Sequence, residues 1–190
     1  MARDFDIAVI GGGVVGLAIL RRFALAGLSC VLLERGADIL SGASKANSAL
    51  LHTGFDAPPG SLELACMRAG YAEYLALRDK LNLPLVRSSA LVTAWSDEEA
   101  AKLEGIVAKA HANGVHDVRP VERDELRRLE PRLSPAAKQA VLVPGEHIID
   151  PWSAPLAYAH QALAHGAVIL RGAEVTGGAF SNGVWTLYST

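Results

Sequence analysis

The sequence has little cysteine, little excess charge and no long apolar segment, and each shortage excludes a class of protein. Cys30 and Cys66 are the only cysteines among 190 residues, too few for a disulfide framework. The formal net charge is only −2, and no Lys/Arg block is present, so nothing indicates nucleic acid or an anionic membrane surface as a partner. The uncharged run from Ile7 to Leu20 has 14 residues and four glycines, too short for a membrane-spanning helix.

The same features predict where the protein resides. Cys30 lies in an apolar run that predicts a core strand, which favours a buried free thiol and a reducing compartment. A secretory signal would need a positively charged start, whereas Arg3 is outweighed by Asp4 and Asp6. We therefore expect a cytoplasmic protein, or one peripheral at the inner membrane face, and no metal site is predicted.

The strongest pattern lies in the first 34 residues. A short apolar run at 6–10 leads directly into Gly11-Gly12-Gly13-Val14-Val15-Gly16. A stretch of small and apolar residues follows, and then a second apolar run that stops at Glu34. The order of strand, glycine turn, helix, strand and terminal acid is that of a dinucleotide-binding βαβ unit.

Each position in this unit has a predicted physical role. Gly11 permits the tight turn out of the first strand, and Gly13 lets a pyrophosphate approach the backbone because it has no Cβ. Gly16 allows the helix to pack closely on the sheet. The N-terminus of the helix presents unpaired N–H groups and the positive end of the helix dipole, which favour phosphate, and Val14 is a candidate cofactor-binding residue there.

Glu34 completes the unit, 18 residues after Gly16. A carboxylate at the end of the second strand accepts hydrogen bonds from ribose hydroxyls. It also repels a 2′-phosphate, although Arg35 beside it weakens that effect. Arg35 is itself a candidate cofactor-binding residue. The alternative, a glycine-rich turn in another α/β protein, would leave Glu34 unexplained.

The segment at 41–55 is small, polar and compatible with a short helix. Ser41 or Ser44 could cap the N-terminus of that helix. Because the segment has few bulky side chains, it suits close approach to a ligand, and Ser44, Asn47 and Ser48 offer hydrogen bonds to it. A short surface helix without a ligand is the alternative.

With these residues in view, the sequence resembles the D-amino-acid-oxidase-like superfamily of FAD-dependent oxidoreductases. The resemblance rests on Asp-x-x-Val-Ile-Gly-Gly-Gly at the start and on the stretch at 42–56, GASKANSALLHTGFD. Residues 125–131 and 145–151 agree with it, so it covers nearly the whole chain in order. The branch that the sequence most resembles holds glycerol-3-phosphate dehydrogenases and L-2-hydroxyglutarate dehydrogenases.

The resemblance implies roles for particular residues. The glycine turn would bind the FAD pyrophosphate, and Glu34 would bind the adenosine ribose. The segment from Ser44 to Thr53 would run along the ribityl chain and the isoalloxazine ring, which places His52 near the flavin as a candidate catalytic residue. Val175 would meet the adenine through its backbone. A polar loop position with no chemistry remains the alternative for His52.

The resemblance also implies a reaction, in which a C–H bond next to a hydroxyl or amine loses hydride to the flavin. The implied substrates are small 2-hydroxy acids or glycerol 3-phosphate, ahead of amino acids, and the electron acceptor is a quinone, another carrier or oxygen. Two alternatives remain open. An NAD-dependent dehydrogenase would need more βαβ repeats after Glu34, and a non-catalytic nucleotide-binding fragment would show no bound flavin.

The predicted fold is α/β: a Rossmann-like FAD-binding domain, built as a parallel sheet with helices, and an inserted α+β substrate domain. Residues 1–84 are expected to form the first part of the FAD-binding domain, and 85–148 the first part of the substrate domain. Residues 149–190 return to the FAD-binding domain with a third, buried parallel strand and an Asn-Gly hairpin. Since the family's members continue further, we expect a truncated chain that binds FAD poorly and is inactive alone.

Between these landmarks, sequence patterns predict further helices and strands. Ser61 begins one helix, and a capping box at 96–99 begins another that ends at Asn113-Gly114. The remaining expected elements are a strand at 85–95, a short strand at 115–121, a helix at 122–129, a strand at 140–143 and a helix at 152–165.

Overall fold

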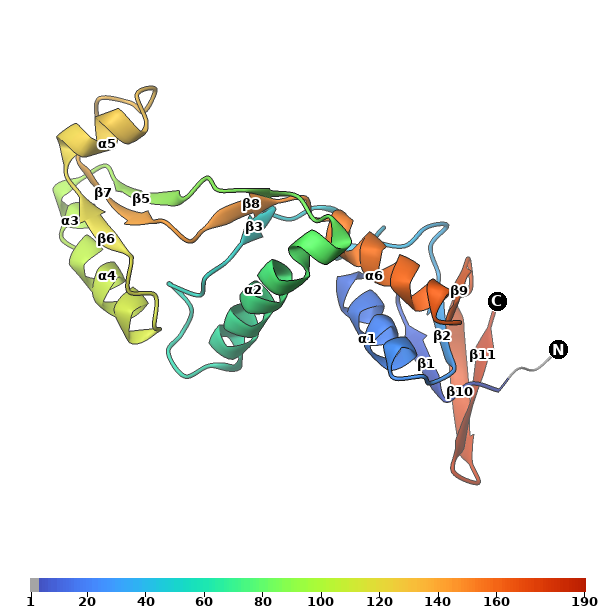
Figure 1. Ribbon diagram of the computed structural model, residues 1–190. Coiled ribbons are helices and arrows are strands. Elements are labelled where there is room, and N and C mark those ends of the chain that lie inside the picture. The colour runs from blue at the N-terminus through green and yellow to red at the C-terminus, as the bar shows by residue number, and fades with distance from the viewer. Residues whose placement is uncertain (1–3) are drawn as a thin grey trace. The chain divides into compact units, whose positions relative to one another are not determined.

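The computed structural model describes residues 4–190, and the chain divides into two compact units (Figure 1). Unit 1 holds the described residues up to Ser48 together with Asp150–Thr190, and unit 2 holds Ala49–Ile149. The elements of unit 1 are β1 (Ile7–Ile10), α1 (Val14–Leu25), β2 (Cys30–Glu34), the 3₁₀ turn η1 (Ala43–Lys45), α6 (Ser153–Ala164), β9 (Val168–Arg171), β10 (Val175–Ser181) and β11 (Val184–Ser189).

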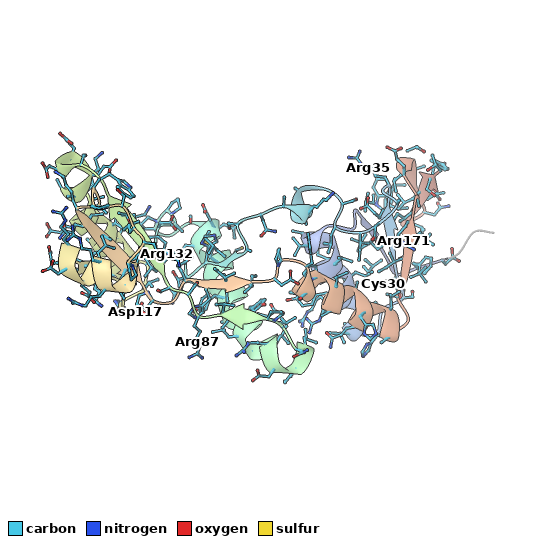
Figure 2. The ribbon with its side chains drawn as sticks, turned by 90° about the horizontal axis from the view of Figure 1, so that it is seen from above. Cys30, Arg35, Arg87, Asp117, Arg132 and Arg171 are labelled. Atoms are coloured by element: carbon cyan, nitrogen blue, oxygen red, sulfur yellow. The ribbon has the colours of Figure 1, made fainter. Side chains whose placement is uncertain are left out.

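Unit 1 is built on a parallel sheet of order β1-β2-β9. The central strand β2 is the most buried, because it has a partner on each side and is covered on both faces. Glu34 at the end of β2 pairs in register with Arg171 of β9. Figure 2 labels Arg171, Arg35 and Cys30, the residue at which β2 begins. The predicted βαβ plan and the parallel third strand are confirmed.

The prediction that the third strand is buried was wrong for its second half. Val168 and Ile169 are half-buried, whereas Leu170 and Arg171 are exposed. The reason is the strand order, because among the described residues β9 pairs only with β2 and so forms an edge of the sheet.

Helices α1 and α6 pack side by side on one face of the sheet (Figure 1). Small and apolar side chains of the two helices and of the sheet form one hydrophobic core between them. The buried members are Val9, Leu17, Leu20, Ala24, Cys30, Leu32, Leu40, Ala159, Ala162 and Ala167. The side chains of this face are buried and closely packed, so they hold the N-terminus of α1 in a fixed place relative to the strand ends.

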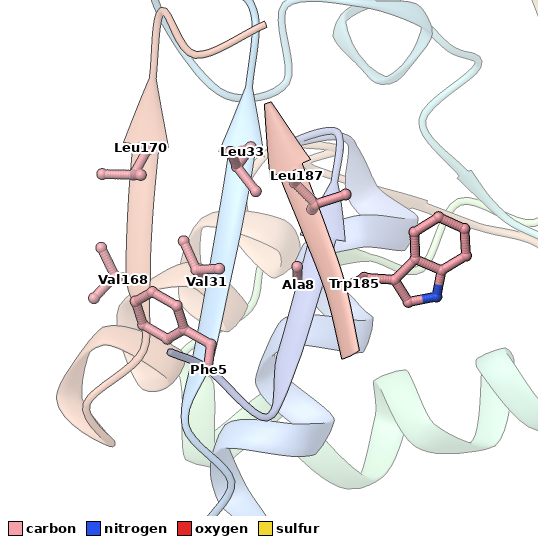
Figure 3. Close-up of a pocket in the computed structure, with 8 residues that line it drawn as sticks. All are labelled: Phe5, Ala8, Val31, Leu33, Val168, Leu170, Trp185 and Leu187. Atoms are coloured by element: carbon pink, nitrogen blue, oxygen red, sulfur yellow. The ribbon is translucent and has the colours of Figure 1, made fainter. Parts of the chain in front are cut away.

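The hairpin β10–β11 lies on the other face. Its turn, Asn182-Gly183, has positive φ at both residues, as the predicted type I′ turn requires. A cavity of about 290 Å³ lies between the sheet and the hairpin (Figure 3). It is lined by Phe5, Ala8, Val31, Leu33, Val168, Leu170, Trp185 and Leu187. None of these lining side chains is charged.

Unit 2 consists of two small sheets and four helices in the described residues. The sheet β3-β8-β4 combines β3 (Leu50–Leu51), β8 (His147–Ile149) and β4 (Leu85–Val86), and all of its pairs are antiparallel. The sheet β5-β7-β6 combines β5 (Ala90–Ala94), β7 (Gln139–Val143) and β6 (Arg119–Val121). The helices are α2 (Leu62–Leu81), α3 (Asp97–Ala100), α4 (Leu103–Ala112) and α5 (Arg123–Leu129).

The compact unit begins at Ala49, whereas the sequence placed a domain boundary at residue 85. The physical reason is strand pairing, because β8 takes β3 on one side and β4 on the other and so draws residues on both sides of that boundary into one sheet. Which residues belong to the FAD-binding domain and which to the substrate domain stays a prediction.

Local signals set most of the element ends in unit 2. Ser61 caps α2 by accepting a hydrogen bond from the N–H of Leu64 at 3.1 Å, as predicted. The helix ends at Leu81 and is followed by Asn82, which adopts the left-handed conformation. The helix after Ser96 is interrupted and continues as α3 and α4, and the strand expected at 85–95 is divided into β4 and β5 by a turn in which Ser89 has φ +56°.

Candidate functional site

The glycine turn of unit 1, at residues 11–16, has the geometry that the sequence predicted: a tight turn out of the first strand and a helix packed closely on it. Gly11 has φ +102°, and its N–H donates to the carbonyl of Leu33 at 2.8 Å. A Cβ on Gly16 would lie 2.0 Å from the carbonyl oxygen of Gly11. Helix α1 therefore lies directly on the turn, and a side chain at Gly16 would force the two apart.

The N-terminus of α1 meets a residue from the segment after β2. Gly13 is the N-cap and has no side-chain hydrogen bond, while the N–H of Val14 donates to Oγ of Ser44 at 3.0 Å. A Cβ on Gly13 would approach the same oxygen to 3.2 Å. The first turn of α1 carries no acidic residue, so no side-chain charge there opposes an anion. Gly13, Val14 and Ser44 therefore lie together at the predicted phosphate position.

The carboxylate of Glu34 links the glycine turn to the loop that follows β2. Its Oε2 accepts from the N–H of Gly12 at 2.6 Å and its Oε1 accepts from the N–H of Gly36 at 2.7 Å. The sequence predicted a ribose contact and missed these two bonds. A carboxylate has about four acceptor positions, so both oxygens retain capacity for ribose hydroxyls.

A cavity of about 300 Å³ lies at the carboxyl ends of β1 and β2. It is lined by Ile10, Gly11, Leu33, Glu34, Arg35, Ala173, Glu174 and Val175. Four residues predicted to bind the cofactor are thus brought together there, although Val175 is 141 positions from Glu34 in the sequence. The carboxyl ends of parallel strands are where open α/β sheets bind their ligands.

The segment at 41–55 differs from its prediction. The expected helix is reduced to η1, whose N-cap is Gly42 and has no side-chain bond. Ser44 is instead an acceptor for α1, and Asn47 donates to its carbonyl at 3.5 Å. Asn47 and Ser48 are exposed. The physical reason is that Asn and Ser favour turns over helix interiors. This stretch therefore contacts α1 through Ser44 instead of forming a longer helix.

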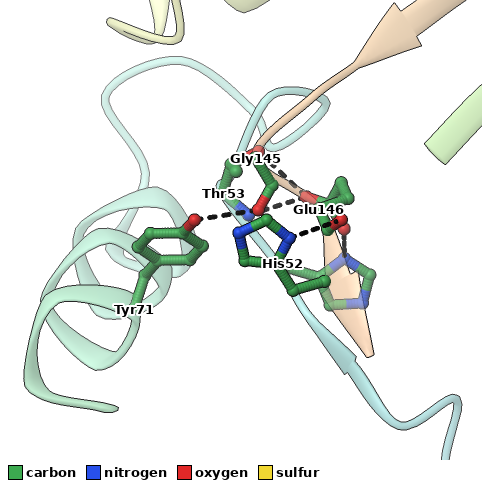
Figure 4. A network of polar contacts seen from close by, with 6 residues as sticks. His52, Thr53, Tyr71, Gly145 and Glu146 are labelled. Atoms are coloured by element: carbon green, nitrogen blue, oxygen red, sulfur yellow. Dashed lines mark hydrogen bonds and ion pairs between the residues drawn. The ribbon is translucent and has the colours of Figure 1, made fainter. Parts of the chain in front are cut away.

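His52 and Thr53 belong to unit 2 and share one partner, the carboxylate of Glu146 (Figure 4). Nδ1 of His52 lies 2.9 Å from Oε2. The N–H and the hydroxyl of Thr53 both donate to Oε1, at 2.7 and 2.9 Å. Glu146 is 1% exposed, whereas the His52 side chain is 38% exposed. A buried carboxylate thus holds a half-exposed imidazole.

Glu146 was absent from the sequence-based site prediction. A signal was available, because it is the one acidic residue in the otherwise apolar run AVLVPGEHII at 140–149. Burying an unpaired carboxylate is costly, so an acid in such a run indicates a partner elsewhere in the fold. Pairing between β3 and β8, with Leu51 opposite His147, brings that partner alongside.

Tyr71 of α2 supports the same cluster. Its hydroxyl donates to the carbonyl of Gly145 at 2.9 Å. Burial raises the pKa of Tyr71, and the carboxylates of Asp117 and Glu146 raise it further, while Arg87 opposes them. The phenol therefore stays protonated and keeps donating at neutral pH.

Tyr71, Thr53 and Gly145 also line a cavity of about 430 Å³. Its other lining residues are Arg68, Gly114, Val115, His116 and Asp117. A guanidinium and an imidazole lie beside a carboxylate there, a set that suits a small polar ligand.

Asn113 fixes the loop that follows Thr53. Its Nδ2 donates to the carbonyl oxygens of Gly54 at 2.9 Å and Ala57 at 2.8 Å, with a longer contact to Phe55 at 3.4 Å. The residue is 2% exposed. The sequence indicated Asn113 only as part of a helix end, so its role in this loop was missed.

A comparison with protein-family models matches residues 6–190 to the family described as FAD dependent oxidoreductase, DAO. The chain belongs to this family. The match supports the resemblance seen in the sequence, and FAD is the cofactor of the family.

Curated relatives point to one branch of the family. Glycerol 3-phosphate dehydrogenase of Caloramator mitchellensis is 32% identical over 171 residues, which cover 90% of this chain and 36% of that protein. Mitochondrial L-2-hydroxyglutarate dehydrogenase of Nematostella vectensis is 30% identical over 177 residues, which cover 92% of this chain and 38% of that protein. The chain thus spans little more than a third of the length of these relatives.

Solved structures agree. FAD-bound L-alpha-glycerophosphate oxidase from Mycoplasma pneumoniae matches with a TM-score of 0.90 at 25% identity, over 99% of this chain and 50% of that one. Glycine oxidase from Geobacillus kaustophilus matches with a TM-score of 0.89 at 26% identity, over 98% and 51%. The α/β fold with a parallel sheet and helices is therefore that of the family. Among residues 4–190, no helix is both long and apolar enough to cross a membrane.

Proposed function

We propose that the full-length protein is an FAD-dependent oxidoreductase that oxidises a small 2-hydroxy acid or a glycerol-3-phosphate-like substrate. The observation that carries the proposal is the arrangement in unit 1, where the glycine turn, Glu34 and Val175 border one cavity at the strand ends. This arrangement fits the adenosine half of FAD, and the family match supplies the cofactor's identity.

In this proposal the phosphate groups of FAD bind at Gly11, Gly13 and the N–H of Val14, with Ser44 beside them. The ribose binds to Glu34 and the adenine meets the backbone of Val175, with Arg35 at the rim. Asn47, Ser48, His52 and Thr53 bind the flavin side of the cofactor. When bound, the flavin supplies a two-electron acceptor for hydride.

The relatives and the polar residues of unit 2 support the proposed substrate class. The two curated relatives are named for glycerol 3-phosphate and L-2-hydroxyglutarate, both anionic secondary alcohols. Arg68 in the cavity of unit 2 offers a cationic partner for such an anion, and the imidazole of His116 offers a hydrogen-bonding group beside it. The electron acceptor is a quinone, another carrier or oxygen, and the free thiols of Cys30 and Cys66 support a cytoplasmic location.

The first test is the cofactor. We expect the purified full-length protein to be yellow and to release FAD on denaturation, identified by chromatography. It should reduce an artificial acceptor with glycerol 3-phosphate or L-2-hydroxyglutarate. A colourless protein that takes up NAD would contradict the proposal and favour an NAD-dependent dehydrogenase.

Gly13→Asp tests the phosphate position directly. The new carboxylate would lie at the N-terminus of α1, beside Ser44, and would repel the pyrophosphate. We expect the Kd for FAD to rise at least about tenfold, which corresponds to about 1.4 kcal/mol of binding free energy, and the FAD content per polypeptide to fall with it. Gly42→Asp is the matched control, because a Cβ there meets nothing within 4 Å. Equal FAD content in both variants would contradict the assignment.

A further inference from the structure

We infer that Glu146 is a positioning residue for His52: it holds the Nδ1–H tautomer of the imidazole, so that Nε2 can take the hydroxyl proton of the substrate. The inference rests on the proposed function for the identity of the reaction. It deepens that function, because it assigns the base and the group that orients it.

The hydrogen bonds that the Glu146 carboxylate accepts determine which ring nitrogen of His52 carries a proton. Oε1 already accepts from both the N–H and the hydroxyl of Thr53. Oε2 faces Nδ1 of His52 at 2.9 Å. A carboxylate has no proton to give, so the proton of this third contact belongs to Nδ1. In the neutral imidazole, which is the form that acts as a base, the lone pair then lies on Nε2.

Burial makes this arrangement rigid. Glu146 is 1% exposed, and a buried carboxylate is stabilised only by its partners, here three donors from two adjacent residues. The hydrogen bond from Tyr71 to the carbonyl of Gly145 holds the preceding residue. A Cβ on Gly145 would lie 2.8 Å from Cγ2 of Thr53, so only glycine allows this close approach.

His52 remains accessible to a substrate. Its side chain is 38% exposed although its Nδ1 is bound to a buried group. Oxidation of a secondary alcohol breaks one C–H and one O–H bond and forms a C=O bond. The hydride, with its electron pair, leaves to the FAD of the proposed function, and the hydroxyl proton goes to Nε2 of His52. An orienting carboxylate behind a catalytic imidazole is a general device for such proton transfers.

Glu146→Gln is the decisive variant. The two donors of Thr53 require an acceptor at Oε1, so the amide oxygen of glutamine takes that position and its NH₂ group faces Nδ1 of His52. Nδ1 must then accept, which moves the ring proton to Nε2 and removes the base. The variant side chain thus keeps nearly the shape of Glu146, while His52 takes the opposite tautomer.

We expect the rate of flavin reduction by glycerol 3-phosphate or L-2-hydroxyglutarate, measured by stopped flow on the FAD-loaded full-length protein, to fall by about 100- to 10,000-fold. FAD content and substrate affinity should stay within about threefold. His52→Gln should lose a similar factor, and the double variant should lose no more than either single one, because the pair acts as a unit. Glu122→Gln is the matched control, since Glu122 is an exposed carboxylate that accepts from Gln139.

A second readout does not depend on turnover. Long-range ¹H–¹⁵N NMR of the full-length protein labelled with ¹⁵N-histidine reports which ring nitrogen carries the proton, and His52→Gln identifies the signal. We expect a protonated Nδ1 in the natural protein and a protonated Nε2 in Glu146→Gln. A natural protein with its proton on Nε2 would overturn the inference, even if the variant fails to fold.

The two proposals can fail separately. A protein that binds FAD and oxidises either substrate, but whose flavin-reduction rate is unchanged in Glu146→Gln, contradicts the positioning role alone. A protein without FAD or turnover contradicts the proposed function, while the tautomer measurement still decides whether Glu146 orients His52.

Discussion

Gly16→Ala is expected to destabilise the full-length protein by at least about 3 kcal/mol, at the upper end of overpacking costs. The added Cβ would lie 2.0 Å from the carbonyl oxygen of Gly11, and neither backbone can yield without moving α1 off the sheet. The same movement displaces the N-terminus of α1, so bound FAD should fall together with stability. Urea unfolding and the FAD content of the purified variant measure the two effects.

Gly70→Ala provides the control for that substitution. Gly70 lies inside α2, and a Cβ there meets nothing within 4 Å. Alanine in an open helix interior is more stable than glycine, so we expect a gain of about 0.5–1 kcal/mol and unchanged FAD. If Gly16→Ala behaved like Gly70→Ala, the close contact between α1 and the glycine turn would be contradicted.

Asn113→Asp is expected to cost about 3–5 kcal/mol, the range for a buried charge left without a partner. The amide nitrogen donates to carbonyl oxygens of Gly54 and Ala57 and lies near that of Phe55. A carboxylate at this 2% exposed position would replace the donor with an acceptor and repel all three. The thermal unfolding midpoint should fall, and because the loop follows Thr53, the flavin-reduction rate should fall as well.

Asn182→Asp makes the same chemical change at an exposed turn. Asn182 has φ +51° in the hairpin β10–β11, a conformation that aspartate also adopts. We expect its unfolding free energy to change by less than about 0.5 kcal/mol, as at most surface positions. Equal midpoints for Asn113→Asp and Asn182→Asp would refute the role of the Asn113 amide in holding the loop.

The sequence predicted much of unit 1 because its signals are local. A strand, a glycine turn, a helix and a second strand follow within 34 residues, and each carries its own period or turn chemistry. Gly11 at φ +102° and Gly16 against the Gly11 carbonyl have the geometry that this pattern requires. The hairpin at Asn182-Gly183 was predictable for the same reason.

Predictions from local sequence patterns were wrong where a residue contacts a distant part of the chain instead of its neighbours in sequence. The stretch around Ser44 is compatible with a helix, but the hydroxyl of Ser44 accepts a hydrogen bond from the N–H of Val14, 30 positions earlier in the sequence. The third parallel strand was expected to be buried, but burial depends on which strands lie beside it, and periodicity does not contain that information.

The sequence by itself determined the dinucleotide-binding plan and the family, because a few glycines and an acid at fixed spacing leave little choice of local backbone. Tertiary structure alone decided how the polar residues of unit 2 are used. Glu146 meets Thr53 across 93 positions, and Asn113 meets Gly54 across 59. Such pairs form because a buried polar group must find a partner wherever the strands bring one, and single-sequence patterns do not specify that partner.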